Sequence, residues 1–162
     1  MKCTFLKEAI VTVVLASSVF AQFEQTAKLA PLDDTPDGDL FGFKVAISGN
    51  TVLVGATQDD ECPEFGTRHG TAYFFELSAG NWTPRGEVWP RDCRASQSSR
   101  FATSLGLYGN TAVIGADLYK PTDDDGKSKG AAFIYRKTEN TWDELRILTP
   151  HDPVEGQRFG AA

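Results

Sequence analysis

The sequence predicts an all-β protein built from four-stranded antiparallel propeller blades, with about two blades and the start of a third. Three observations lead to this fold class. The chain repeats itself at an offset of 60 residues, Gly-Asn turns separate short β-rich runs, and no sustained helical period follows the N-terminal segment. The 15 Gly and 11 Phe against one Met also fit many turns between short aromatic-rich strands.

Length and charge exclude several classes of protein. The 162 residues are a usual size for one domain, and 41% hydrophobic with 23% charged residues is typical of a globular chain. The formal net charge of −6 is unfavourable for binding nucleic acid, which needs a basic surface to neutralise phosphates. The same charge is unfavourable for docking on anionic membranes. We therefore expect an acidic, β-rich protein without a nucleic-acid partner.

Residues 1–21 are predicted to be a signal peptide. The apolar run Ala9–Leu15 is followed by Val19 and Ala21, which stand three and one residues before a predicted cleavage between Ala21 and Gln22. A membrane anchor needs about 20 consecutive apolar residues, and this run is shorter. The sequence thus predicts a secreted, extracellular protein with no membrane span.

Export gives the remaining cysteines a redox context. Cys62 and Cys93 stay in the mature chain, and an isolated pair in an oxidising compartment is a candidate disulfide. No histidine stands close to either cysteine in sequence, which makes a zinc site unfavourable. We favour the bridge, with two free thiols as the alternative. Asn81 begins the only N-x-S/T sequon and is a predicted glycosylation site in a eukaryotic secretory route.

The internal repeat divides the chain into a lead-in segment and successive copies. Without gaps, Phe41 matches Phe101, Gly49-Asn50-Thr51 matches Gly109-Asn110-Thr111, and Gly55-Ala56 matches Gly115-Ala116. We place the acidic lead-in at residues 22–40, repeat 1 at 41–100, repeat 2 at 101–158, and a truncated repeat 3 at 159–162. Closed propellers have about four to eight blades, so we expect a fragment of a longer protein, or copies that assemble into a ring.

Each repeat is predicted to form four antiparallel strands. In repeat 1 the first two are Lys44–Ser48 and Thr51–Val54, joined by the hairpin signal Gly49-Asn50. A polar loop leads to a third strand at Thr71–Leu77, and a turn leads to a fourth that begins at Trp82. Repeat 2 follows the same pattern, and four such strands describe a propeller blade. The aromatic residues are expected to fill the blade core: Tyr73, Phe74, Phe75, Trp82, Phe133, Tyr135 and Trp142.

The repeated elements resemble a known family. Phe41-Gly42 with Val54-Gly55-Ala56, and Phe101-Ala102 with Ile114-Gly115-Ala116, are similar to the FG-GAP repeat of integrin alpha-subunit propellers, and closer still to its secreted branch. The resemblance covers about residues 28–162 and implies a β-propeller that binds an extracellular ligand or matrix component, as in cell adhesion.

Departures from the family pattern limit what the resemblance implies. Thr57 and Asp117 stand where the family has Pro after Gly-Ala, and the second Phe-Gly element is Phe-Ala, with Ala102 in place of Gly. The family holds calcium in an Asp-rich loop between the two elements, but here that interval is a tight turn without a carboxylate. We therefore do not carry over the integrin-type calcium cage.

Acidic residues are concentrated elsewhere, in the loops that join the second strand to the third. Antiparallel strands place these loops and the connections from the fourth strand to the next first strand on one face. Carboxylates in flexible loops suit Ca²⁺, which takes six to eight oxygen ligands. We favour the interpretation that they are solvated loops that keep strand edges apart, with a calcium site as the alternative and no certain cofactor. The candidate ligands are Asp59, Asp60, Glu61, Asp123, Asp124 and Asp125.

No catalytic motif is present in the sequence, and we predict a non-catalytic protein. His69 and His151 are not part of an H-E-x-x-H arrangement and are expected at the surface. The favoured function is recognition of an extracellular protein or glycan. One alternative is the propeller portion of a larger extracellular enzyme, such as secreted phospholipase D of the GPI-cleaving type. Another is a purely structural envelope or matrix repeat protein.

Overall fold

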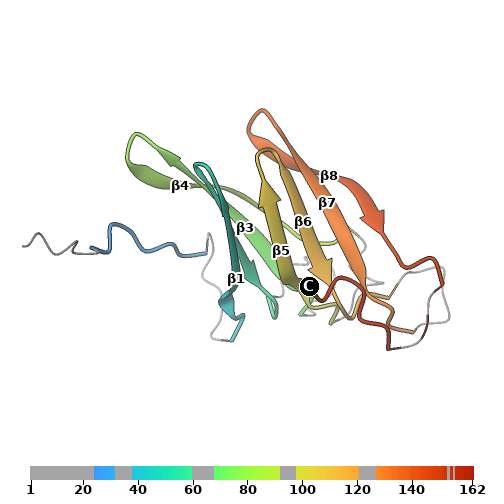
Figure 1. Cartoon of the computed structure of the whole chain (residues 1–162). Helices are drawn as coiled ribbons and strands as arrows, with labels where there is room; N and C mark the ends of the chain where they lie inside the picture. The colour runs from blue at the N-terminus through green and yellow to red at the C-terminus, as the bar shows by residue number, and fades with distance from the viewer. Residues whose placement is uncertain are drawn as a thin grey trace, which may run out of the picture.

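The computed structural model describes residues 24–31, 38–59, 68–91, 98–120, 127–152, 154 and 156–162. It confirms the all-β prediction, because eight strands form two four-stranded antiparallel sheets that lie side by side as propeller blades (Figure 1). The described segments contain no helix that is long and apolar enough to cross a membrane.

The two sheets are repeats of one design, with each strand hydrogen-bonded to the next in the chain. Blade 1 consists of β1 (Phe41–Ser48), β2 (Thr51–Ala56), β3 (Thr71–Ser78) and β4 (Asn81–Val88). Blade 2 consists of β5 (Phe101–Tyr108), β6 (Thr111–Ala116), β7 (Ala131–Thr138) and β8 (Thr141–Leu148).

The first strand of each blade begins three residues earlier than the predicted one, because it contains a β-bulge. Phe41 pairs with Ala56 and Lys44 with Gly55, so the two residues between Phe41 and Lys44 have no partner on β2. Gly42 takes a φ of 88° there, and Ala102 takes a φ of 66° at the same place in blade 2. The bulge interrupts the alternation of side chains between the two faces of the strand, and this alternation is the pattern by which a strand is recognised in a sequence. The fourth strand of blade 1 also begins one residue early, at Asn81.

The Gly-Asn turns join β1 to β2 and β5 to β6, as predicted. Gly49 and Gly109 adopt φ values of 57° and 53°, which glycine does without steric cost. The main-chain carbonyl oxygens of the two asparagines accept hydrogen bonds from the third strands. Leu77 N lies 2.8 Å from Asn50 O, and Lys137 N lies 2.9 Å from Asn110 O. Each turn therefore also fixes the register of a third strand.

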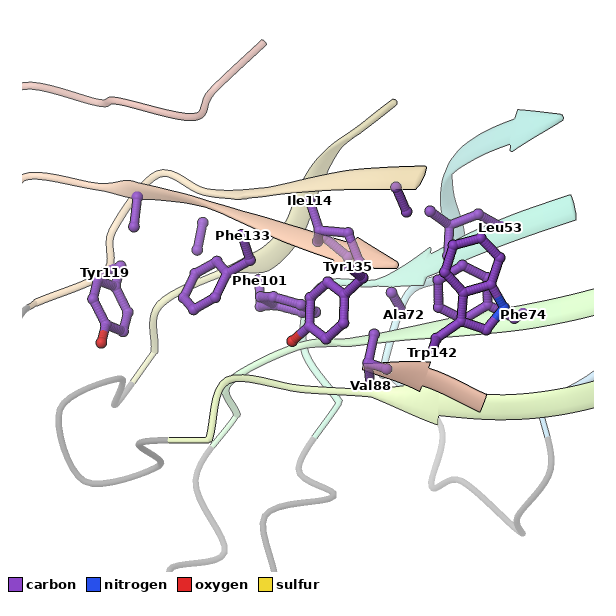
Figure 2. Packing of buried hydrophobic residues seen from close by; sticks show 14 residues of the cluster. Leu53, Ala72, Phe74, Val88, Phe101, Ile114, Tyr119, Phe133, Tyr135 and Trp142 are labelled. Atoms are coloured by element: carbon purple, nitrogen blue, oxygen red, sulfur yellow. The ribbon is translucent and has the colours of Figure 1, made fainter. Parts of the chain in front are cut away.

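The main hydrophobic core lies between the blades, which stack face to face (Figure 2). Leu53, Ala72 and Phe74 come from blade 1, and they meet a larger set of side chains from blade 2. The Phe74 and Trp142 rings stack with centroids 4.0 Å apart and planes 7° apart. The prediction that the aromatic residues form the core is confirmed, with Trp82 half-buried against a second cluster.

The second cluster covers the opposite face of blade 1 and contains Val52, Val54, Ala56, Tyr73 and Phe75. The Phe41 ring packs edge-on against Tyr73 and Phe75, at 5.4 and 6.3 Å between centroids.

Blade 2 repeats this packing in the core between the blades. The Phe101 ring contacts Phe133 at 5.2 Å and Tyr135 at 6.2 Å in the same edge-on manner. The phenylalanine that opens each repeat thus packs against the equivalent pair of aromatic residues on β3 or β7. Burial of such a ring contributes roughly 1.5–3 kcal/mol, so this position fixes the start of each blade.

Candidate functional site at the loop end of the blades

The connections between second and third strands meet the segments that enter each blade at one end of the molecule, here called the loop end. In blade 1, Gln58 N donates to Asp39 O at 3.2 Å. In blade 2, Leu118 N donates to Ser99 O at 3.1 Å at the equivalent positions. For these residues the predicted common face is confirmed, and backbone hydrogen bonds hold the connections together.

The junction between the blades at the loop end is formed by backbone groups. Phe101 N donates to His69 O at 2.8 Å, and Ser99 Oγ donates to the same oxygen at 3.0 Å. His69 is buried, so the prediction of a surface histidine is wrong for this residue. The cause is the neighbouring blade, because its first residues pair with the His69 backbone and enclose it. His151 is exposed as predicted, with Nδ1 3.2 Å from Asp152 Oδ1.

Glycine is required where the blades approach most closely. A Cβ on Gly70, which has a φ of 89°, would overlap the Phe101 carbonyl oxygen. A Cβ on Gly55 would lie 2.9 Å from Ala102 Cβ. The Gly-Ala element of one repeat therefore packs against the opening Phe-Gly or Phe-Ala element of the next.

The predicted third copy docks in the same way on blade 2. Phe159 N donates to Lys129 O at 3.2 Å, and Phe159 forms a parallel bridge with Gly130. Gly160 has a φ of 81° and stands where Gly42 and Ala102 stand in the first two copies. A Cβ on Gly115 would overlap the Gly160 carbonyl oxygen. Residues 159–162 thus begin a third junction.

Asp59 is the one predicted calcium ligand that the structure describes. Its side chain is 1% exposed and accepts a hydrogen bond from the Tyr73 hydroxyl. The equivalent residues of blade 2 are Tyr119 and Phe133, whose rings pack edge-on at 5.3 Å. A polar pair in one blade therefore replaces an aromatic pair in the other, and the Asp59 carboxylate has a structural partner.

The other predicted acidic ligands lie outside the described residues. These are Asp60, Glu61, Asp123, Asp124 and Asp125. In the part of the chain that the structure describes, no group of three or more His, Cys, Asp or Glu side chains could hold a metal ion. Calcium binding by the acidic loops stays a prediction.

Two further predictions also concern residues that are not described. Cys62 and Cys93, and the cleavage site between Ala21 and Gln22, lie outside the described residues. Asn81 is described and exposed at the start of β4, with Nδ2 3.4 Å from Ala79 O. Its glycosylation stays a prediction.

Asp117 connects successive copies at the loop end, a role that sequence reasoning missed. The carboxylate is 3% exposed, and its Oδ2 lies 3.4 Å from Arg100 Nη1 and 3.8 Å from Arg158 Nη1. Arg100 enters blade 2 and Arg158 enters the third copy. The signal in the sequence was the departure from the family pattern, because Asp117 occupies the position where the family has Pro.

A pocket of about 190 Å³ opens at the loop end, between blade 1 and the segment entering blade 2. Its lining includes the Arg68 and Arg100 guanidinium groups, and Arg68 Nη1 donates to Gln58 Oε1 at 3.0 Å. Guanidinium groups bind carboxylates and other oxygen acceptors through several N–H donors in a fixed geometry. The pocket can therefore hold an acceptor-rich group of a ligand. Its lining residues are Thr57, Gln58, Arg68, Ser98, Arg100 and Leu118.

Part of the chain matches a known repeat family. Residues 23–75 match the model of the FG-GAP repeat family, a segment that includes β1, β2 and most of β3. No curated protein matches the chain.

Proposed function

Because this chain carries an FG-GAP repeat and folds into propeller blades, we propose that it is a non-catalytic recognition module of the extracellular space. Its ligand is a protein or a glycan, bound through the loop end. The observation that carries the proposal is the joining of loops from both blades by backbone hydrogen bonds on a sheet scaffold. Loops held by a rigid scaffold are the usual location of binding residues.

The pocket with Arg68 and Arg100 supports recognition at this end. Arg100 is engaged by Asp117, whereas Arg68 is exposed and contacts the Gln58 amide oxygen. Arg68 is therefore the cation that a ligand can reach with the least rearrangement. We expect it to bind a carboxylate or a comparable acceptor group on the partner.

The proposal is tested with the secreted protein on arrays of immobilised matrix proteins and glycans. Arg68→Ala should lower binding to any ligand found by about tenfold, which is the effect of removing a hydrogen bond to a charged group. Arg85→Ala is the matched control, because Arg85 is also exposed but lies on β4 and pairs with Glu76 at 3.2 Å. Absence of any ligand, or equal effects of both variants, would contradict the proposal.

The acidic loops provide a second test of the same face. Reversing the charge at Asp123, Asp124 and Asp125 should weaken binding of the partner, with or without a bridging cation. Repeating the measurement with calcium removed by a chelator separates the two cases. Unchanged affinity would remove these loops from the binding surface.

A further inference from the structure

A second cleft, distinct from the pocket at Arg68, lies between the last strands of the two blades. It has a volume of about 210 Å³ and lies where β4 passes β8. Figure 2 shows Val88 from β4 close to Tyr135 and Trp142 of blade 2. The lining residues are Glu87, Val88, Trp89, Arg91, Tyr135, Trp142, Asp143 and Glu144.

Trp142, which lines the cleft, carries a hydrogen-bond donor without a partner among the described residues. Trp142 is 7% exposed, and its indole is fixed by stacking on Phe74 at 4.0 Å. Its Nε1 is buried and has no hydrogen-bond partner among the described residues. Buried donors are almost always satisfied, so a solitary one beside a cleft indicates a missing acceptor.

Glu144, which also lines the cleft, carries an acceptor oxygen without a partner among the described residues. Glu144 lies two residues after Trp142, and alternate residues of a strand share one face of the sheet. Its Oε2 is buried and has no partner among the residues that the structure describes. Burial raises the pKa of the Glu144 carboxyl group, while the Arg91 charge and the Tyr135 hydroxyl partly oppose this shift. The Oε2 atom is thus poorly solvated and suited to accept from a ligand hydroxyl group.

The groups that line the cleft disfavour anions and metal ions. An anion would meet the carboxylates of Glu87, Asp143 and Glu144, with Arg91 as the one basic residue of the lining. No group of three or more His, Cys, Asp or Glu side chains among the described residues could hold a metal ion. A neutral ligand with both hydroxyl donors and acceptors would satisfy Trp142 and Glu144 together. Its apolar C–H groups would pack on Val88 and the aromatic rings. These are the properties of a pyranose ring.

We propose that this cleft binds a single neutral sugar residue, with Trp142 Nε1 donating to a ring or hydroxyl oxygen and Glu144 accepting from hydroxyl groups. The inference rests on the proposed recognition function and names a ligand class for it. The volume is below the roughly 300 Å³ at which sites for larger small molecules begin, which fits one ring rather than a chain.

The repeat supplies an internal control for the site. At the 60-residue offset, Trp142 corresponds to Trp82 and Glu144 corresponds to Pro84. Proline has no side-chain acceptor, and Trp82 does not line this cleft. Trp82→Phe therefore makes the same chemical change as Trp142→Phe at a place where we propose no sugar site.

The test is titration of the secreted protein with the methyl glycosides of glucose, galactose, mannose, fucose and N-acetylglucosamine. Saturation-transfer NMR and tryptophan fluorescence report binding. At least one glycoside should bind saturably. Trp142→Phe, which keeps the aromatic stack but removes the donor, and Glu144→Gln, which keeps the shape but removes the charge, should each weaken it by about tenfold. Trp82→Phe should leave it unchanged.

Two outcomes would overturn the sugar site. One is that no glycoside binds the parent protein at concentrations up to 50-fold above ~1 mM, the upper end of weak specific binding. The other is that a glycoside binds but Trp142→Phe and Glu144→Gln have no effect. Thermal unfolding of each variant confirms folding, and Glu144→Gln alone decides the question if Trp142→Phe is unfolded.

Failure of this inference is distinguishable from failure of the proposed function. Arg68→Ala should retain glycoside binding, because Arg68 does not line the cleft between β4 and β8. If no glycoside binds but a loop-end ligand binds and Arg68→Ala weakens its binding, only the sugar site is overturned. Glycoside binding without any ligand at the loop end would leave the sugar site standing and contradict the loop-end proposal.

Discussion

Asp59 and Tyr73 of blade 1 are equivalent to Tyr119 and Phe133 of blade 2. The same blade fold therefore accommodates either a polar or an aromatic buried pair at these positions. In blade 1 the Tyr73 hydroxyl donates to a carboxylate that is enclosed by protein. Tyr73→Phe removes this donor, and a buried charged acceptor that loses a donor costs about 1–3 kcal/mol. We expect the free energy of unfolding to fall by that amount, measured by urea denaturation.

The control for this prediction comes from blade 2. In the double variant Asp59→Tyr/Tyr73→Phe, blade 1 receives the aromatic pair that Tyr119 and Phe133 form in blade 2. This variant should recover part of the stability that Tyr73→Phe loses, because no carboxylate is left buried. A double variant less stable than Tyr73→Phe would show that the two blades do not share this packing solution.

The Glu144 carboxyl group predicts a pH dependence of stability. Burial raises its pKa in the folded protein, so the folded state binds this proton more tightly than the unfolded state. Stability therefore falls as pH rises from the usual glutamate pKa of about 4.3 to the raised value. Glu144→Gln removes the titratable carboxyl group and its pH-dependent contribution to stability. The variant should therefore gain stability relative to the parent as the pH rises from 4 to 7. A difference that stays constant over this range would contradict the shift.

At the level of strands and turns, substitutions at two glycines distinguish the cost of backbone strain from the cost of disrupting the contact between the blades. Gly42 and Gly70 have φ values of 88° and 89°, but a Cβ on Gly42 meets nothing within 4 Å, whereas one on Gly70 overlaps the Phe101 carbonyl. Gly42→Ala should cost about 1–2 kcal/mol from left-handed strain alone. Gly70→Ala should cost clearly more and should speed hydrogen exchange of the Phe101 amide, which bonds to His69. Equal losses would show that close contact at Gly70 does not stabilise the junction.

The strands were largely predictable, because their order follows from local turns and alternating side chains. The extension of β1 to Phe41 was missed, since Gly42 reads as a strand breaker although it forms a bulge. The burial of His69 was also missed, because it depends on a neighbouring blade rather than on the residues beside it.

The cleft between β4 and β8 was not predicted for a related reason. The stacking of the two blades creates it, and Trp142 appeared in the sequence only as a core aromatic. A difference between the repeats marked the place, since Glu144 in repeat 2 corresponds to Pro84 in repeat 1.

For the whole molecule, the two blades differ in what covers one of their faces. Leu53 and Val88 on blade 1 are 0% and 9% exposed, because blade 2 packs on them. Their equivalents on blade 2, Val113 and Leu148, are 41% and 38% exposed. This face of blade 2 is the counterpart of a buried interface, and the third-copy residues Phe159 and Gly160 contact blade 2 at Gly130 and Gly115.

This asymmetry predicts self-association when residues 22–162 are produced alone. Exposed contiguous apolar surface favours association, and the face around Val113 repeats the packing side of blade 1. Sedimentation velocity should show oligomers whose fraction rises with protein concentration. Val113→Asp should shift the equilibrium toward monomer, because association would then bury a charge without a partner. Tyr108→Asp is the control, since Tyr108 is 88% exposed at the end of β5. A concentration-independent monomer would show that the face around Val113 does not recruit a second copy.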